Sequence, residues 1–120
     1  MTNAPRWVPL WFRIATIYGV VALTGAAFGA PAGAAALPHY AFVGTALAFH
    51  ALFWIIAGDP VRYRPVMLAA VAEKAAFTIP ALLLVARGTV PASTALFAAI
   101  DAVLGIGFLL AWRATPRRAG

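Results

Sequence analysis

The third long apolar stretch of the sequence carries two consecutive charged residues near its middle. Glu73 and Lys74 lie within "MLAAVAEKAAFTIPALLLVA", residues 67–86. A carboxylate beside an ammonium group can form an ion pair, and a carboxyl group near a histidine can share a proton with it. His50 and Asp101 occupy the middle of the two neighbouring apolar stretches. These four ionisable residues are therefore the candidate site for a ligand or a proton.

Long hydrophobic helices would have to position this site. The 120 residues are 64% hydrophobic and 10% charged, whereas soluble domains usually carry about 25% charged residues. Crossing a bilayer takes roughly 20 apolar residues in a helix, and such runs occur four times, at residues 10–29, 39–58, 65–86 and 91–112. The runs lack the alternating polar pattern of barrel strands. The sequence predicts one all-α domain over residues 1–120, an integral membrane four-helix bundle.

The four ionisable residues are expected at one depth in this bundle. If the second, third and fourth spans are centred near residues 48, 75 and 102, a rise of 1.5 Å per residue places the four in a layer roughly 5 Å thick. Side chains of consecutive residues leave a helix about 100° apart, so Glu73 and Lys74 can face different neighbours. Sequential helices joined by short loops pack antiparallel. We expect Glu73 to meet His50, and Lys74 to meet Asp101.

Pairing of these charges is close to obligatory in lipid. A single charge at the bilayer centre costs between about 3 and more than 10 kcal/mol, depending on the scale used. Lys74 with two ionised carboxylates leaves one negative charge, which a proton on His50 or on either carboxyl would cancel. The layer could thus hold a mobile proton. It could equally serve only to fix helix register and partners, and the sequence leaves both alternatives open.

Small and aromatic residues near the layer are candidates to line a ligand space, with ordinary core packing as the alternative role of each. They are Tyr18, Phe77, Thr78, Phe97 and Gly105. The sequence contains no Gly-rich phosphate loop, no nucleophile elbow and no paired histidines at ligand spacing. It therefore names no catalytic residue, no metal site and no required cofactor. Cysteine is absent, which excludes disulfides and thiolate ligands.

The positions of the arginines predict the direction of the helices. Only Arg87 falls on one side of a four-span arrangement. The others fall on the opposite side: Arg6, Arg13, Arg62, Arg64, Arg113, Arg117 and Arg118. By the positive-inside rule both termini are cytoplasmic. The tryptophans share that side, where their rings suit the headgroup region: Trp7, Trp11, Trp54 and Trp112.

A secretory signal peptide is an alternative for the first span. Arg6 and Arg13 would form its basic region, residues 14–28 its apolar region, and "APAGA" a small-residue cleavage site. Cleavage would leave three spans. The aromatic cluster around Trp11 favours an interfacial anchor and an uncleaved first span.

The turn between the second and third spans carries a short motif. In "GDPVRYRP", Asp59 can cap the turn and Arg62 can pair with the same carboxylate. This motif, within "DPVRYRPVMLAAVAEKAAF" and followed by "AAIDAVLGIGFLLAWRAT", resembles uncharacterised small four-span bacterial inner-membrane proteins. In architecture these are similar to DoxX-like proteins, whose family name derives from a quinol oxidase accessory subunit. The resemblance covers about the last half of the chain and attaches no activity to the positions it shares: Asp59, Arg62, Lys74 and Asp101.

Together these features favour a membrane protein that binds a small hydrophobic ligand, a quinone or a lipid, or serves as accessory subunit of a membrane redox complex. A pocket between helices with a few convergent polar groups is the usual form of such a site. Alternatives are a proton-coupled transporter of small molecules and a purely structural subunit. An intramembrane enzyme with His50 and Glu73 as acid and base ranks lowest.

The expected partners are membrane lipid and either a second copy of the chain, as a homodimer, or a larger membrane complex. The net charge of +6 would suggest nucleic acid in a soluble protein. Here the arginines lie at the ends of the apolar segments, so nucleic acid is not expected.

Overall fold

The computed structural model describes residues 3–118, and within that range all regular structure is helical. Four long helices follow one another, with short 3₁₀ turns at Gly33–Ala35 and Arg64–Val66 leading into the second and third. They are α1 (Trp7–Phe28), α2 (Ala36–Gly58), α3 (Met67–Ala86) and α4 (Thr94–Ala114). Each is long and apolar enough to cross a membrane. The four predicted spans are therefore four helices, with ends that differ from the prediction by a few residues.

The end of α3 shows how the local sequence stops a helix. Gly88 has a φ of +70°, a left-handed conformation that glycine adopts without steric cost. Its N–H bonds to the carbonyl of Val85 at 3.0 Å, and the N–H of Thr89 bonds to the carbonyl of Leu84 at 3.0 Å. This pair of bonds is the Schellman arrangement, which satisfies the last carbonyls of a helix. The chain can then turn back into α4.

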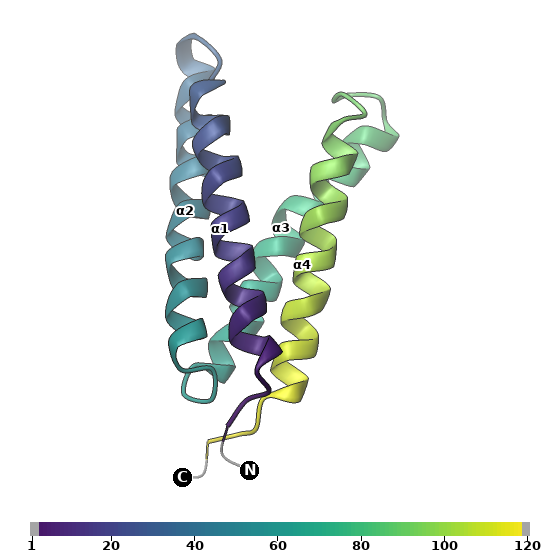
Figure 1. The fold of residues 1–120 in the computed structure, drawn as a ribbon. Coiled ribbons are helices and arrows are strands. Elements are labelled where there is room, and N and C mark those ends of the chain that lie inside the picture. The colour runs from purple at the N-terminus through teal and green to yellow at the C-terminus, as the bar shows by residue number, and fades with distance from the viewer. Residues whose placement is uncertain (1–2, 119–120) are drawn as a thin grey trace.

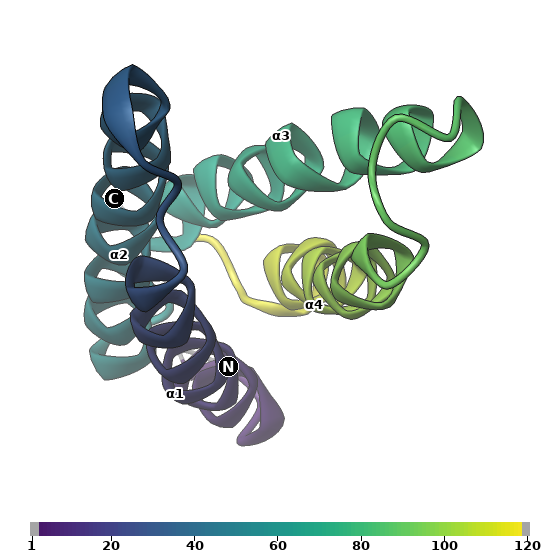
Figure 2. The ribbon, with the colours of Figure 1, turned by 90° about the horizontal axis from the view of Figure 1, so that it is seen from above.

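The four helices form two antiparallel hairpins, α1 with α2 and α3 with α4. The hairpins meet at the end that holds both termini and the α2–α3 turn, and they diverge toward the two other loops (Figure 1). Seen from above, each hairpin forms a separate pair (Figure 2). Helices α2 and α3 make few contacts with each other, and so do α1 and α4. Sequential helices pack closely within each hairpin, whereas contact between the hairpins is concentrated at the end where they meet.

A compact aromatic core closes that end, which we call the closed end. The rings of Phe12 and Phe108 are stacked with centroids 4.4 Å apart, and Phe53 packs on Phe108 at 4.9 Å. The indole N–H of Trp11 donates to the carbonyl of Leu104 at 3.1 Å. An added Cβ at Gly107 would overlap this indole. The small residue on α4 therefore allows α1 to approach closely.

The α2–α3 turn is bonded to the end of α4. The Arg64 Nε–H donates to the carbonyls of Trp112 at 3.0 Å and Thr115 at 2.7 Å, which are among the unpaired carbonyls at a helix C-terminus. In the turn itself, the Asp59 carboxylate accepts the backbone N–H of Arg62 at 3.2 Å. The two side chains form no ion pair, because the Arg62 guanidinium lies over the neighbouring tyrosine ring instead.

Candidate functional site

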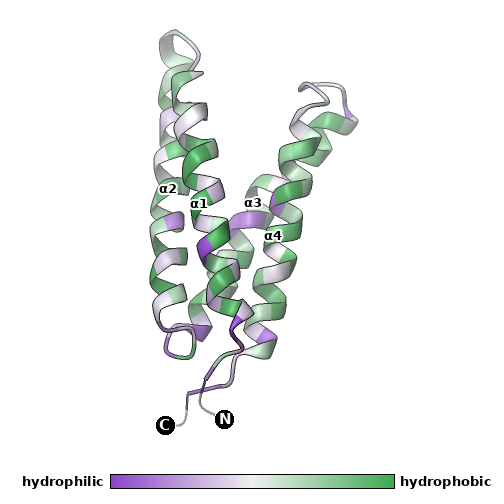
Figure 3. Ribbon diagram, in the orientation of Figure 1, coloured by the Kyte–Doolittle hydropathy of each residue, from purple (hydrophilic) through white to green (hydrophobic). Residues whose placement is uncertain are grey.

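Hydrophilic segments lie partway along otherwise hydrophobic helices (Figure 3). Lys74 forms ion pairs with Glu73 and Asp101, and we call these three residues the ion-paired cluster. The Lys74 ammonium on α3 is 3.4 Å from the Asp101 carboxylate on α4 and 3.5 Å from the Glu73 carboxylate. The predicted contact between Lys74 and Asp101 is thus present. A Cβ added at Gly105 would stand 3.0 Å from the Lys74 Cβ. Because glycine has no side chain, α3 and α4 come close enough for this ion pair to form.

His50 lies on α2 and is only 2% exposed. Its ring occupies the space beside Gly19 of α1, where an added Cβ would overlap the imidazole. Nδ1 is 2.6 Å from the carbonyl oxygen of Ala46. Since a carbonyl only accepts hydrogen bonds, Nδ1 carries the hydrogen. In a neutral imidazole the other nitrogen is then an acceptor, and this buried Nε2 has no hydrogen-bond partner.

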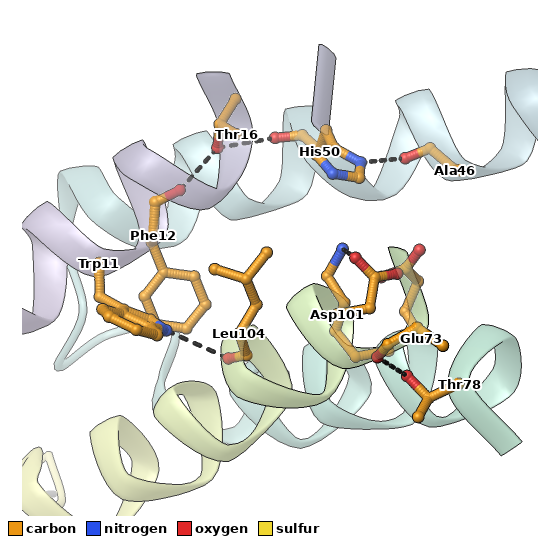
Figure 4. A network of polar contacts seen from close by, with 11 residues as sticks. Trp11, Phe12, Thr16, Ala46, His50, Glu73, Thr78, Asp101 and Leu104 are labelled. Atoms are coloured by element: carbon orange, nitrogen blue, oxygen red, sulfur yellow. Dashed lines mark hydrogen bonds and ion pairs between the residues drawn. The ribbon is translucent and has the colours of Figure 1, made fainter. Parts of the chain in front are cut away.

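Glu73 does not form the predicted contact with His50. One of its carboxylate oxygens lies near the Lys74 ammonium at 3.5 Å but is buried without a hydrogen-bond partner. His50 faces Glu73 and Asp101 from the opposite side of a gap between the hairpins (Figure 4). The physical reason is the divergence of α2 from α3, together with the packing of the imidazole ring against α1.

The gap is a cleft of about 640 Å³ lined by all four helices. We call it the interhairpin cleft. Its polar lining residues are Tyr18, His50, Glu73, Lys74, Thr94 and Asp101, and its aromatic residues include Phe42, Phe77 and Phe97. The cleft runs from the layer of charged residues toward the diverging ends of the hairpins, because its other lining residues lie on that side of the layer. The aromatic core of the closed end lies on the other side.

Three of the five predicted lining residues border the interhairpin cleft, namely Tyr18, Phe77 and Phe97. The other two lie in the contact between α3 and α4. The Thr78 hydroxyl donates to the carbonyl of Ala98 at 3.5 Å, and Gly105 faces Lys74.

Sequence reasoning missed Phe42 and Gly19, which the structure places at the interhairpin cleft. A signal for Gly19 was available. Glycine inside a helix costs about 1 kcal/mol relative to alanine, so an interior glycine often marks a close approach. No comparable signal distinguishes Phe42 from the other phenylalanines of the chain.

A second groove of about 570 Å³ runs between α2 and α3. It shares Phe42, Ala46, Glu73 and Phe77 with the interhairpin cleft. The rings of Phe42 and Phe77 are 6.0 Å apart between centroids. These two rings border both spaces and so form the partition between them.

Within residues 3–118, no three His, Asp or Glu side chains gather closely enough to hold a metal ion. Comparisons with protein-family models, with curated proteins and with solved structures found no match to this chain. The resemblance to DoxX-like proteins therefore stays a prediction.

Proposed function

We propose that the chain is a multi-pass protein of the bacterial inner membrane that binds a small amphiphile in the interhairpin cleft. The polar head would lie at His50, Glu73 and Asp101, and the apolar body between the diverging hairpins. Quinones and single-chain lipids belong to this class of ligand. The observation that carries the proposal is a cleft with largely apolar walls and two buried, unpartnered polar atoms at its inner end.

The size and chemistry of the interhairpin cleft suit such a ligand. Pockets for small molecules usually enclose about 300–1,000 Å³ and combine apolar walls with a few convergent polar groups. At about 640 Å³ the cleft falls within this range. A buried polar atom without a partner costs roughly 1–3 kcal/mol. A ligand that donates a hydrogen bond to the Nε2 of His50 or to the Glu73 carboxylate would recover part of that cost.

Placement in the membrane is supported by the outward-facing side chains. Large apolar residues are exposed along every helix, among them Val21 at 69%, Leu37 at 75% and Leu96 at 62%. Toward the closed end, Arg13 lies over the Trp54 ring and Arg64 over the ring of Trp112. Arginine and tryptophan are typical of the cytoplasmic interface, so we place both termini in the cytoplasm.

Native mass spectrometry of gently purified protein tests the proposal, because it would show a retained amphiphile by mass. Gly25→Phe is the matched blocking variant, since Gly25 lines the cleft and an added Cβ there meets nothing within 4 Å. Gly44→Phe is the control. Gly44 is equally free of neighbours and lies outside the lining of both spaces.

We expect the amphiphile on the wild-type protein and on Gly44→Phe, and its loss from Gly25→Phe. Equal retention by Gly25→Phe and Gly44→Phe would show that the amphiphile binds elsewhere. A folded wild-type protein that retains none would contradict the proposal. Recovery only in association with another subunit would favour the purely structural role.

A proton-coupled transporter is the second candidate function. One observation favours it: the interhairpin cleft reaches a set of titratable groups from one end only, while the aromatic core closes the other. A midplane carboxylate is the expected device of proton coupling. The double variant His50→Phe with Glu73→Gln keeps approximate volume. In proteoliposomes this double variant should abolish the pH-dependent flux of the transported small molecule, while the protein still assembles. Unchanged pH dependence of the flux in this folded variant would show that His50 and Glu73 are not the proton-coupling pair, and absence of any flux from the wild type would exclude the transporter.

A further inference from the structure

At its inner end the interhairpin cleft is lined by the charged residues Glu73, Lys74 and Asp101. Their charges narrow the class of ligand, and this inference rests on the proposed function. We propose that the occupant of the interhairpin cleft is a single-chain amphiphile whose head is a cation with N–H donors, of the primary ammonium type. Its head lies between His50 and Glu73, and its alkyl chain follows the apolar walls toward the diverging ends.

The first argument is the charge balance of the inner end. Among residues 3–118, Lys74 is the one cation that lines the interhairpin cleft, while Glu73 and Asp101 contribute two carboxylates. With a neutral His50 and both carboxylates ionised, this set carries one net negative charge. An uncompensated charge at membrane depth is expensive, so the set needs either a bound proton or a further positive charge. A cationic ligand head supplies it, in place of a proton.

The second argument is the type of the two unpartnered atoms. Nε2 of neutral His50 is an acceptor because Nδ1 donates to Ala46. The Glu73 oxygen that lies 3.5 Å from the Lys74 ammonium is also an acceptor when the carboxyl is ionised. The inner end of the cleft therefore offers acceptors, and a head group that binds there must donate. An ammonium head offers up to three donors, whereas an oxidised quinone offers only carbonyl acceptors.

The third argument excludes an anionic head. The Lys74 ammonium is the donor that such a head would need, and it is already held by two carboxylates at 3.4 and 3.5 Å. It also lies 5.5 Å from the centroid of the Phe53 ring, a cation–π distance. A fatty-acid or phosphate head would therefore meet two carboxylates and no free cation. Like charges brought together in this way disfavour binding.

The space beyond the head fits an unbranched alkyl chain. On α1 the lining extends from Tyr18 to Ala26, eight steps along the helix and a depth of roughly 12 Å at 1.5 Å per residue. Leu23, Phe42 and Phe97 provide apolar walls over this depth. A chain of about twelve carbons would fill it and project slightly beyond the mouth.

Three probes with the same twelve-carbon chain test the head group. Dodecylammonium, dodecanol and dodecanoate are added in equal amounts to the purified protein, and the bound fraction of each is read by native mass spectrometry. The wild type should retain dodecylammonium at least about tenfold over dodecanoate, and more than dodecanol, because opposite charges attract and like charges repel at the site.

Glu73→Gln is the test variant, since it keeps the shape of the side chain and leaves Lys74 paired with Asp101. It should lower the preference for dodecylammonium over dodecanol by about tenfold, as expected when a charged hydrogen-bond partner is removed. Asp59→Asn is the matched control. Asp59 is the one carboxylate side chain of the sequence outside the cluster, and this variant should keep the wild-type preference.

Each result separates the two proposals. Retention of dodecanol or dodecanoate at least as strong as that of dodecylammonium would overturn the cationic head, yet leave amphiphile binding intact. An equal change in the preference for dodecylammonium over dodecanol in Glu73→Gln and Asp59→Asn would also overturn the cationic head and leave amphiphile binding intact. If the folded wild type retains none of the probes, or a second copy of the chain fills the cleft, the proposed function itself fails.

Discussion

The packing of His50 against Gly19 fixes the one imidazole that borders the interhairpin cleft. The ring lies beside α1, and Nδ1 is bonded to Ala46. The ring fits there because Gly19 has no side chain. A core this tightly packed does not accept extra atoms without shifts. The position of the imidazole therefore depends on residue 19 as much as on residue 50.

Gly19→Ala should destabilise the protein by about 1–3 kcal/mol, because the new methyl group overlaps the imidazole. The loss should largely disappear when His50→Ala is present as well. Gly25→Ala is the control, because an added Cβ there meets no atom within 4 Å, and we expect it to be neutral or slightly stabilising. Unfolding in a denaturing-detergent titration measures these three variants, with His50→Ala alone as the reference for the double variant. An equal effect of Gly19→Ala with and without His50 would show that the two residues do not interact.

The same residues show what the sequence could predict of the site. Lys74 and Asp101 were expected to pair because lipid leaves buried charges few alternatives, and the structure has that pair. The contact of Glu73 with His50 was expected from angular spacing alone. That spacing cannot tell which face α2 turns toward α3, because the answer depends on Gly19 and on the divergence of the hairpins.

At the scale of the helices, the ion-paired cluster joins α3 to α4 and includes no residue of α2. All three charged groups belong to one hairpin, and the Lys74 ammonium joins its two helices. The α1–α2 hairpin is joined differently, by hydrogen bonds to backbone carbonyls such as that of His39 to the Ala26 carbonyl at 2.7 Å. Each hairpin thus has polar contacts of its own.

The ion pair across α3 and α4 predicts coupling between Lys74 and Asp101. We place the test in a Glu73→Gln background, because Glu73 shares the same ammonium. There, Lys74→Leu or Asp101→Leu alone strands a buried charge and should cost roughly 3–5 kcal/mol. The combined variant removes both charges and should lose less than the sum, with a coupling of about 1–3 kcal/mol. Additive losses of unfolding free energy would mean that the two groups do not interact in the membrane.

Helix positions followed closely from the sequence, whereas helix packing did not. The apolar runs located α1 to α4 within a few residues, because only a long apolar helix satisfies its backbone in lipid. The angle between the hairpins depends on side-chain shape at the closed end, for example on Trp11 against Gly107. Hydropathy carries no information about such contacts.

At the scale of the whole molecule, both termini and the α2–α3 turn lie at one end, and the other two loops lie at the opposite end (Figure 1). The arginine distribution predicts that the first end is cytoplasmic. The absence of cysteine allows a clean test of this direction. A single cysteine can be labelled without any background from the chain.

Val61→Cys in the α2–α3 turn should resist a membrane-impermeant thiol reagent applied to intact cells. Ala34→Cys and Thr89→Cys, in the two other loops, should react with it. Permeabilised cells supply the control, because all three positions should then be labelled. Labelling of Val61→Cys in intact cells would contradict the proposed direction, and protection of both Ala34→Cys and Val61→Cys would mean that α2 does not cross the membrane.

The divergence of the hairpins has a consequence for how the interhairpin cleft would be supplied. If the closed end is cytoplasmic, as we propose, a cleft that runs away from it opens into the outer leaflet, and its occupant would exchange with lipid by lateral diffusion. Occupancy would then follow the mole fraction of the ligand in that leaflet. Adding empty lipid at constant protein and ligand would dilute the ligand and release it, even though its total concentration in the sample stays the same.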